Sequence, residues 1–254
     1  MQTARYGWLP QLPDHRDLPM LVSREETPAA VDLRPLFPPV WDQGTLGSCT
    51  GHACAAAIAY ARTSENLSVV MPSRLMLYYD ARRIEGTTGS DCGAQIRDVI
   101  KGAGSFGVCP EELWPYDPTK CLIAPTQDAY DAGTKDRALG YHSVPQDLSA
   151  LRSVIAGGDP IVFGFSVYEG FESDEVAKTG KLQLPARKEA LVGGHAVIAV
   201  GYDNDTRCFT VRNSWSGQWG DAGYFYMPYD YITDEDLASD FWCITLVTAP
   251  APLV

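Results

Sequence analysis

The chain has 254 residues, of which 20 are Lys or Arg and 32 are Asp or Glu, so its formal net charge is −12 at neutral pH. With 45% hydrophobic and 20% charged residues, it has the composition of a globular protein long enough to bury one or two cores. Because it has no dense cluster of Lys and Arg, neither nucleic acid nor a membrane surface is an expected partner. The longest apolar runs, such as 196–200, are far shorter than the roughly 18 residues that a membrane helix needs.

The first 28 residues are rich in proline and charge and lack a sustained period, which is typical of an extended arm. They contain no apolar core of the length that a signal peptide needs, so no Sec-type export signal is expected. The cytoplasm is therefore the default location, and secretion by another route stays open. We expect residues 1–28 to form an arm and residues 29–254 to form the folded domain.

The expected elements change in character along the folded domain. The alanine-rich segment 53–62 and the segments 73–83 and 94–103 have helical patterns, and only one further helix is expected, at 148–156. Short apolar runs bounded by Gly, Pro and Asp predict strands at 160–168, 195–203, 208–215 and 223–229, with a hairpin turn at 203–206. Helices followed by strands indicate an α+β fold. We expect a helical lobe at about 45–137 and a strand-rich lobe at about 138–254, with a cleft where they meet.

The seven cysteines are scattered and form no CxxC motif, so neither a zinc ribbon nor a redox pair is indicated. Their odd number leaves at least one thiol free, and burial as small apolar side chains is the expectation for most of them. No metal site and no cofactor are predicted. The cysteines are Cys49, Cys54, Cys92, Cys109, Cys121, Cys208 and Cys243.

One cysteine has neighbours suited to nucleophilic catalysis. Cys49 lies at or near the start of the alanine-rich helix, and a helix N-terminus and a nearby imidazolium both lower the pKa of a thiol. His195 follows two glycines at the head of an expected strand, and Asn213 on the neighbouring strand could orient its ring. Six residues before the thiol, Gln43 could place an amide NH2 beside the backbone N–H of Cys49 as a second oxyanion donor. The four residues together fit an acyl-transfer site.

Three ordered segments resemble the papain-like cysteine peptidases: Gln43–Cys49, Gly194–Val197 and Arg212–Tyr224. The likeness extends over about residues 31–227. It implies a two-subdomain fold with a helical left lobe, an antiparallel β-barrel-like right lobe and the active-site cleft between them. It also implies Cys49 as the nucleophile, His195 as general base and then acid, Asn213 as the orienting residue and Gln43 in the oxyanion hole.

The same resemblance implies residues that bind the substrate. Trp215 would shield the hydrogen bond between Asn213 and His195, Trp219 would border the primed side of the cleft, and the backbone of Gly93 would pair with the substrate chain. Three glycines would line the pocket for the second residue upstream of the cut: Gly164, Gly193 and Gly194. Because they are small, we expect a roomy pocket that accepts bulky apolar side chains.

The chain also departs from the family pattern. Leu46 and Thr50 stand where the family often has a cysteine and an aromatic residue, so the usual disulfide of that loop cannot form, which argues against an oxidising compartment. The long helical propeptide of the family is missing, and the short form looks more like the bacterial branch than like plant or lysosomal enzymes. Residues 1–28 are a candidate short pro-segment that lies in the cleft and keeps the enzyme latent.

The expected function is that of a cysteine endopeptidase, which hydrolyses peptide bonds of a peptide or protein substrate through a thioester acyl-enzyme. Two alternatives stay open: an acyl transferase or ligase that uses the same site, and a catalytically silent binding relative. His52, three residues after Cys49, is a rival base, although a surface or core histidine is favoured. The sequence does not encode the oligomeric state, and a monomer is the default.

Overall fold

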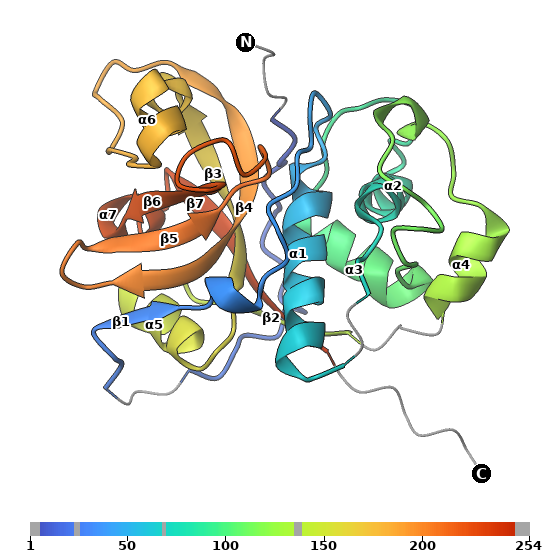
Figure 1. Cartoon of the computed structure of the whole chain (residues 1–254), viewed down its shortest axis with the longest axis horizontal. Helices are drawn as coiled ribbons and strands as arrows, with labels where there is room; N and C mark the ends of the chain where they lie inside the picture. The colour runs from blue at the N-terminus through green and yellow to red at the C-terminus, as the bar shows by residue number, and fades with distance from the viewer. Residues whose placement is uncertain (1–5, 23–25, 68–69, 135–138, 247–254) are drawn as a thin grey trace.

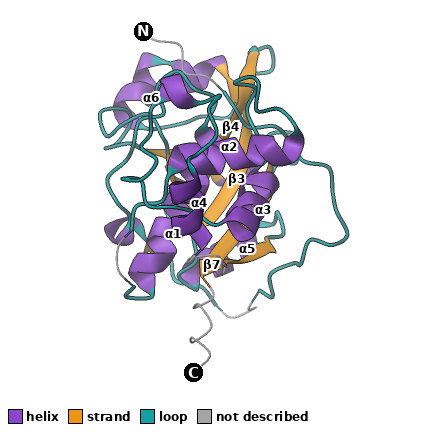
Figure 2. Cartoon of the chain, turned by 90° about the vertical axis from the view of Figure 1, so that its right-hand side faces the viewer, coloured by secondary structure: helices purple, strands orange, loops and turns teal. Residues whose placement is uncertain are grey.

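The structure is a computed structural model that describes residues 6–22, 26–67, 70–134 and 139–246. Four helices form one half of the molecule in Figure 1, and an antiparallel sheet forms the other half. The helices are α1 (Cys49–Ser64), α2 (Arg74–Glu85), α3 (Ile96–Phe106) and α4 (Gln127–Gly133). The turned view in Figure 2 places α2, α3 and α4 in front of strands β3 and β4.

Helix α1 is the central helix of the fold. Thirteen of its 16 residues are buried, and many of them are alanines, whose small side chains let other elements approach from every side. The next helix has defined ends: the Ser73 hydroxyl accepts a hydrogen bond from the backbone N–H of Met76, and Gly86 ends α2 with φ 73°. The expected helices at 53–62, 73–83, 94–103 and 148–156 are confirmed, and the last is α5 (Leu148–Ala156).

The sheet has seven strands, whose order is β2-β7-β3-β4-β5-β6, with β1 paired to β4. All its pairings are antiparallel, and within the described residues the end strands β2 and β6 do not pair with each other, so the sheet is open. The strands are β1 (Ala30–Asp32), β2 (Leu139–Ser143), β3 (Ile161–Tyr168), β4 (Leu191–Asp203), β5 (Cys208–Arg212), β6 (Tyr224–Pro228) and β7 (Ala238–Leu246). Two more short helices, α6 (Asp174–Thr179) and α7 (Tyr229–Ile232), accompany the sheet. The predicted α+β fold of a helical and an antiparallel lobe is confirmed.

Strand β4 connects the two halves, because both of its faces are buried. Val197 and Ala199 join the core inside the strand-rich half. Ala196, Ile198 and Val200 alternate with them and pack in the core shared with α1 and α3. A residue near the start of this buried segment, such as His195, therefore has a fixed position relative to α1.

Several helices and strands of the structure were not predicted from the sequence. Strand β7 begins with Ala238, Ser239 and Asp240, a polar start that hides its strand character, and β2 and α4 are short. Strand β5 ends at Arg212, before the expected 215, so Asn213 follows the strand. The expected lobe boundary at 137/138 falls on residues 135–138, outside the described residues, and stays a prediction.

Residues 6–22 of the arm pass between the two halves (Figure 1). The backbone N–H of Trp8 donates to Gly194 O at 3.0 Å, and that of Leu9 donates to Ala94 O at 3.1 Å. Further along, Met20 N donates to Ser143 O at 2.8 Å. The arm is thus paired with both halves, whereas residues 1–5 and 23–25 of the predicted arm lie outside the described residues.

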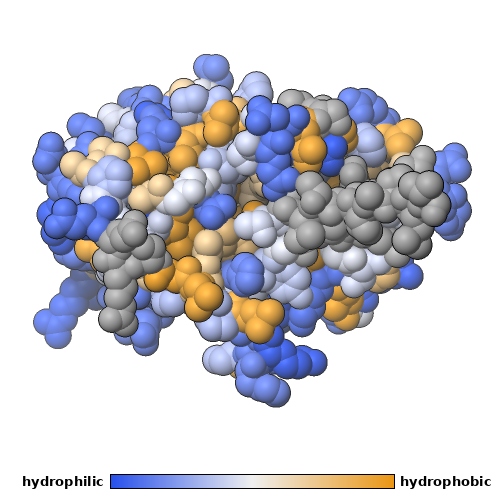
Figure 3. Space-filling model, turned by 90° about the horizontal axis from the view of Figure 1, so that it is seen from below, coloured by the Kyte–Doolittle hydropathy of each residue, from blue (hydrophilic) through white to orange (hydrophobic). Residues whose placement is uncertain are grey.

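The surface mixes polar and apolar groups. On the face seen from below, apolar side chains lie in separate groups between hydrophilic ones (Figure 3). No helix in the described ranges has both the length and the apolar character needed to cross a membrane. Five of the seven cysteines are buried, which confirms burial as the usual environment of these side chains.

Candidate active site

Cys49 is the first residue of α1, and its side chain is fully buried. Its Sγ accepts a hydrogen bond from the backbone N–H of Ala196 at 3.4 Å. Because Ala196 directly follows His195 on β4, the thiol of the helical half meets the sheet next to the predicted base. The Cys49 backbone N–H belongs to the first turn of α1, where N–H groups have no acceptor within the helix.

His195 and Asn213 form the hydrogen bond that the sequence predicted. The distance between His195 Nε2 and Asn213 Oδ1 is 2.8 Å, and the same Oδ1 accepts from the backbone N–H of Ser214 at 2.8 Å. The Ser214 bond identifies this atom as the amide oxygen, so His195 Nε2 carries the proton. Nδ1 of His195, which has no partner among the described residues, is therefore the basic nitrogen of the ring.

One tryptophan packs against the His195 ring, and a second packs against the first. The ring of Trp215 lies 5.1 Å from the His195 ring at an interplanar angle of 33°. Trp219 lies 5.2 Å from Trp215 at 83°, and both indoles contact Phe171. Trp215 thus packs over one side of the imidazole, and its role in shielding the hydrogen bond between Asn213 and His195 stays a prediction.

Gln43 is fully buried, and hydrogen bonds fix its side chain. Its Nε2 donates to Leu46 O at 2.7 Å, and its Oε1 accepts from the Ser214 hydroxyl at 2.6 Å. The amide NH2 therefore lies against the loop that leads to Cys49, and the amide oxygen faces the segment after Asn213.

Burial shifts both titratable groups toward their neutral forms. Desolvation raises the pKa of Cys49 to about 11, against the opposing effect of backbone hydrogen bonds from Ala196 and Gly7. Desolvation lowers the pKa of His195 to about 4, against the opposing hydrogen bond to Asn213. With the arm in place, the site therefore holds a thiol and a neutral imidazole.

The arm occupies the space in front of Cys49. A Cβ on Gly7 would lie 1.8 Å from Gly47 O, and a Cβ on Gly93 would lie 2.4 Å from Gly7 O, so only glycines permit this approach. The Gly7 carbonyl accepts from Ala94 N at 2.8 Å. The arm thus pairs with the backbone of Ala94, and the pairing of the Gly93 backbone with a substrate chain stays a prediction.

The aromatic residues beside Gly7 lie against the predicted substrate-binding residues. A Cβ on Gly164 would lie 1.9 Å from the Trp8 indole, and one on Gly194 would lie 2.8 Å from it. A Cβ on Gly193 would instead lie 2.7 Å from Tyr6, whose ring is 6.1 Å from Trp215. The three predicted pocket glycines therefore receive two different side chains of the arm.

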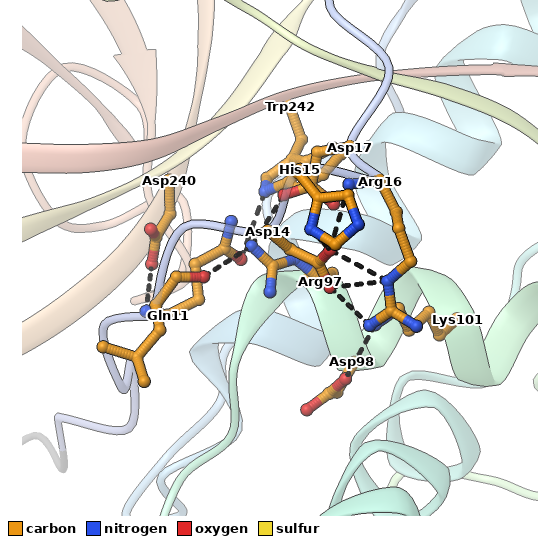
Figure 4. A network of polar contacts seen from close by, with 11 residues as sticks. Gln11, Asp14, His15, Arg16, Asp17, Arg97, Asp98, Lys101, Asp240 and Trp242 are labelled. Atoms are coloured by element: carbon orange, nitrogen blue, oxygen red, sulfur yellow. Dashed lines mark hydrogen bonds and ion pairs between the residues drawn. The ribbon is translucent and has the colours of Figure 1, made fainter.

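A polar network anchors the arm beyond Trp8 (Figure 4). Asp240 Oδ2 accepts from Trp8 Nε1 at 2.9 Å and from Gln11 N at 3.0 Å. Arg97 of α3 pairs with Asp17 at 2.7 Å. The sequence offered one signal for these contacts, a glycine between two aromatic residues at 6–8, and no signal for Asp240, whose position depends on β7.

His52, the rival base, is a core histidine. Its side chain is 2% exposed, and desolvation followed by the charge of Arg74 lowers its pKa to about 3. Its Nδ1 lies 3.0 Å from Ser48 O.

Comparisons with known proteins agree with this arrangement. The family model described as "Papain family cysteine protease" matches residues 27–241. An uncharacterized peptidase C1-like protein of Acanthamoeba polyphaga mimivirus is 44% identical over 218 residues, which cover 82% of this chain and 70% of the viral protein. A gut-specific cysteine proteinase of Caenorhabditis elegans is 27% identical over 193 residues, 74% of this chain and 52% of that protein. The crystal structure of xylellain, a cysteine protease from Xylella fastidiosa, matches with a TM-score of 0.89 and 41% identity over 95% of this chain and 96% of that one.

Proposed function

Because the chain belongs to the papain family of cysteine proteases, we propose that it is an endopeptidase that cuts peptide bonds through a thioester on Cys49. It is a cysteine peptidase, and its substrates are peptides or proteins. The observation that carries the assignment of roles is the hydrogen bond between His195 Nε2 and Asn213 Oδ1. That bond leaves Nδ1 of His195 as the acceptor for a proton.

In this mechanism, His195 Nδ1 takes the proton of the Cys49 thiol, and the thiolate attacks the substrate carbonyl carbon. The resulting oxyanion receives hydrogen bonds from the Gln43 amide and the Cys49 N–H. The imidazolium then protonates the leaving amine as the C–N bond breaks, which leaves the thioester. A water molecule, deprotonated by the same Nδ1, attacks the thioester, and the thiol recovers its proton when the acid product leaves.

The test is turnover of a fluorogenic peptide. Cys49→Ala removes the nucleophile and is expected to abolish turnover. Cys54→Ala is a matched control, because Cys54 is also fully buried on α1 but takes no part in the mechanism. Undiminished activity of Cys49→Ala would end the proposal.

We further propose that the arm keeps the enzyme latent. Gly7 blocks the approach to Cys49, and burial under the arm disfavours the thiolate. The direction of the arm also matters. A substrate would run from the Gly164 pocket, upstream of the cut, to Trp219 on the primed side. The arm runs the opposite way, from Tyr6 near Trp215 to Trp8 at Gly164, so its peptide bonds meet Cys49 in reverse.

Removal of the arm tests this latency. A chain that begins at Pro28 is expected to turn over the peptide faster than the full chain, because the cleft is then open to substrate. A synthetic peptide of residues 6–17, added back, should inhibit the shortened chain competitively. Equal activities of the two chains would contradict latency, even if the peptidase mechanism is correct.

A further inference from the structure

His52 has one ring nitrogen whose role is fixed by its neighbours. Nδ1 lies 3.0 Å from Ser48 O, a carbonyl that can only accept, and 3.4 Å from Ser48 Oγ. The Tyr116 hydroxyl donates its proton to Gln43 O at 2.8 Å, so Ser48 Oγ, 2.6 Å from that hydroxyl, is the donor to Tyr116. Ser48 Oγ can then only accept from His52. Both neighbours require the proton on Nδ1, which makes Nε2 of the neutral ring an acceptor.

Asn213 has the complementary group. Because its Oδ1 accepts from His195 and from Ser214 N, its Nδ2 is a donor. Asn213 Nδ2 and His52 Nε2 are both buried, and neither has a hydrogen-bond partner among the described residues. An unpaired buried polar atom costs stability, so two of opposite character in one region need an explanation.

His52 and Asn213 line the same small cavity, which has a volume of about 10 Å³. The other walls come largely from apolar residues of α1 and β4, among them Ala56 and Ile198. The buried side chains of Arg212 and Ser214 also line the cavity, and they donate hydrogen bonds elsewhere: Arg212 to Pro38 O, Pro39 O and the Tyr224 hydroxyl, and Ser214 to Gln43. A cavity of this volume can hold about one water molecule, and a buried water needs at least two polar partners. The cavity therefore offers the space, one donor and one acceptor.

We propose that this cavity binds one water molecule, which accepts a hydrogen bond from Asn213 Nδ2 and donates one to His52 Nε2. His52 is then a positioning residue for the catalytic pair. Its Nδ1 binds Ser48, the residue before Cys49, and its Nε2 reaches through the water to the amide that orients His195. The water site is independent of the proposed peptidase function, whereas the positioning role rests on that function.

The positioning role has a consequence for the protonated imidazole. Asn213 Oδ1 stabilises the imidazolium only while the amide keeps its orientation, and the water fixes the NH2 end of that amide. Without the acceptor of His52, the amide gains freedom to turn, and the imidazolium of His195 loses its proton at lower pH.

Two variants of the full chain separate this role from packing. His52→Phe keeps a ring of similar size but offers no acceptor, whereas His52→Gln keeps an amide oxygen and an N–H. For His52→Phe we expect kcat/KM to fall about tenfold, the size expected for one buried donor left unpaired. We also expect the alkaline limb of its kcat/KM–pH profile to move toward lower pH. His52→Gln should restore much of the activity and the position of the limb.

A crystal structure of the full chain tests the water directly, whether or not the chain is active. Electron density for a single water within hydrogen-bond distance of Asn213 Nδ2 and His52 Nε2 is the expected result, and a dry cavity would overturn the water site. An unchanged pH profile in a folded His52→Phe protein would overturn the positioning role. If thermal unfolding shows that His52→Phe does not fold, His52→Leu, which also lacks an acceptor, takes its place. A limb at lower pH in His52→Leu then supports the role, and an unshifted limb overturns it. Failure of the peptidase proposal would show instead as full activity of Cys49→Ala.

Discussion

The Gln43 carboxamide makes two hydrogen bonds that determine which way it faces. Its NH2 bonds to Leu46 O, and its oxygen accepts from the Ser214 hydroxyl. Leu46 lies on the loop before Cys49 and Ser214 follows Asn213, so one side chain connects the segments that carry the nucleophile and the orienting residue. An oxyanion donor with a fixed orientation needs no reorganisation when charge develops on the substrate.

The first prediction therefore concerns Gln43→Ala. Loss of one oxyanion donor should lower kcat on the order of 100-fold and change KM little, because the donor acts mainly on the developing charge. Initial rates with a fluorogenic peptide measure both constants. Gln127→Ala, on the exposed surface of α4, is the control and should keep the parent kcat. A kcat within twofold of the parent for Gln43→Ala would remove Gln43 from the oxyanion hole.

Residues whose role depends on local chemistry could be predicted from sequence. Cys49 could be identified because it stands at the start of a helix. His195 and Asn213 could be identified together because a hairpin brings strand β4 beside β5. Asp240 and Ala94 could not be predicted in this way. Their contacts with the arm arise because an extended segment with no local pattern lies across the finished fold, and tertiary packing alone determines its register.

At the scale of elements, apolar periodicity explains what was predicted. Helix α1 was predicted by its alanines, and β4 by a continuous apolar run that is buried on both faces. Strand β7 was missed although it pairs with both β2 and β3, because its first residues, ending with Asp240, are polar or small and hide the apolar pattern that follows. The polar residue that hides the strand is the one that binds the arm.

The second prediction tests the arm as an element. Gly7→Ala adds a Cβ 1.8 Å from the backbone oxygen of Gly47, and backbone on both sides leaves no flexible group that could yield. The arm should leave the cleft, so the full Gly7→Ala chain should approach the kcat/KM of the chain that begins at Pro28. Gly89→Ala is the control, because a Cβ there meets nothing within 4 Å. A Gly7→Ala chain as slow as its parent would show that the arm does not limit activity.

At the scale of the whole molecule, Asp240 lies where the arm, the sheet and the helical half meet (Figure 4). Burial raises its pKa to about 6, and Asp17 adds to the rise, whereas hydrogen bonds from Gln11 and Trp8 and the charge of Arg97 oppose it. When the arm leaves, water reaches the carboxyl group and its pKa falls toward its ordinary value. The docked state therefore binds more protons than the undocked state between about pH 4 and 6.

The third prediction follows from the sign of this difference. A group whose pKa is higher in the docked state favours docking at low pH, and that contribution is lost as pH rises through about 6. Desolvation under the arm also lowers the pKa of His195, and that shift opposes docking at low pH, so the contribution of Asp240 is measured against a variant that lacks its titration. The activity of the full chain divided by that of the chain from Pro28 should increase more between pH 5 and 7.5 in the parent than in Asp240→Asn, by several-fold, because one pKa unit corresponds to about tenfold in the docking equilibrium. The quotient cancels the pH dependence of catalysis itself. Asp240→Asn keeps an acceptor but does not titrate, and the same pH dependence of the quotient in the parent and in Asp240→Asn would mean that Asp240 does not govern docking.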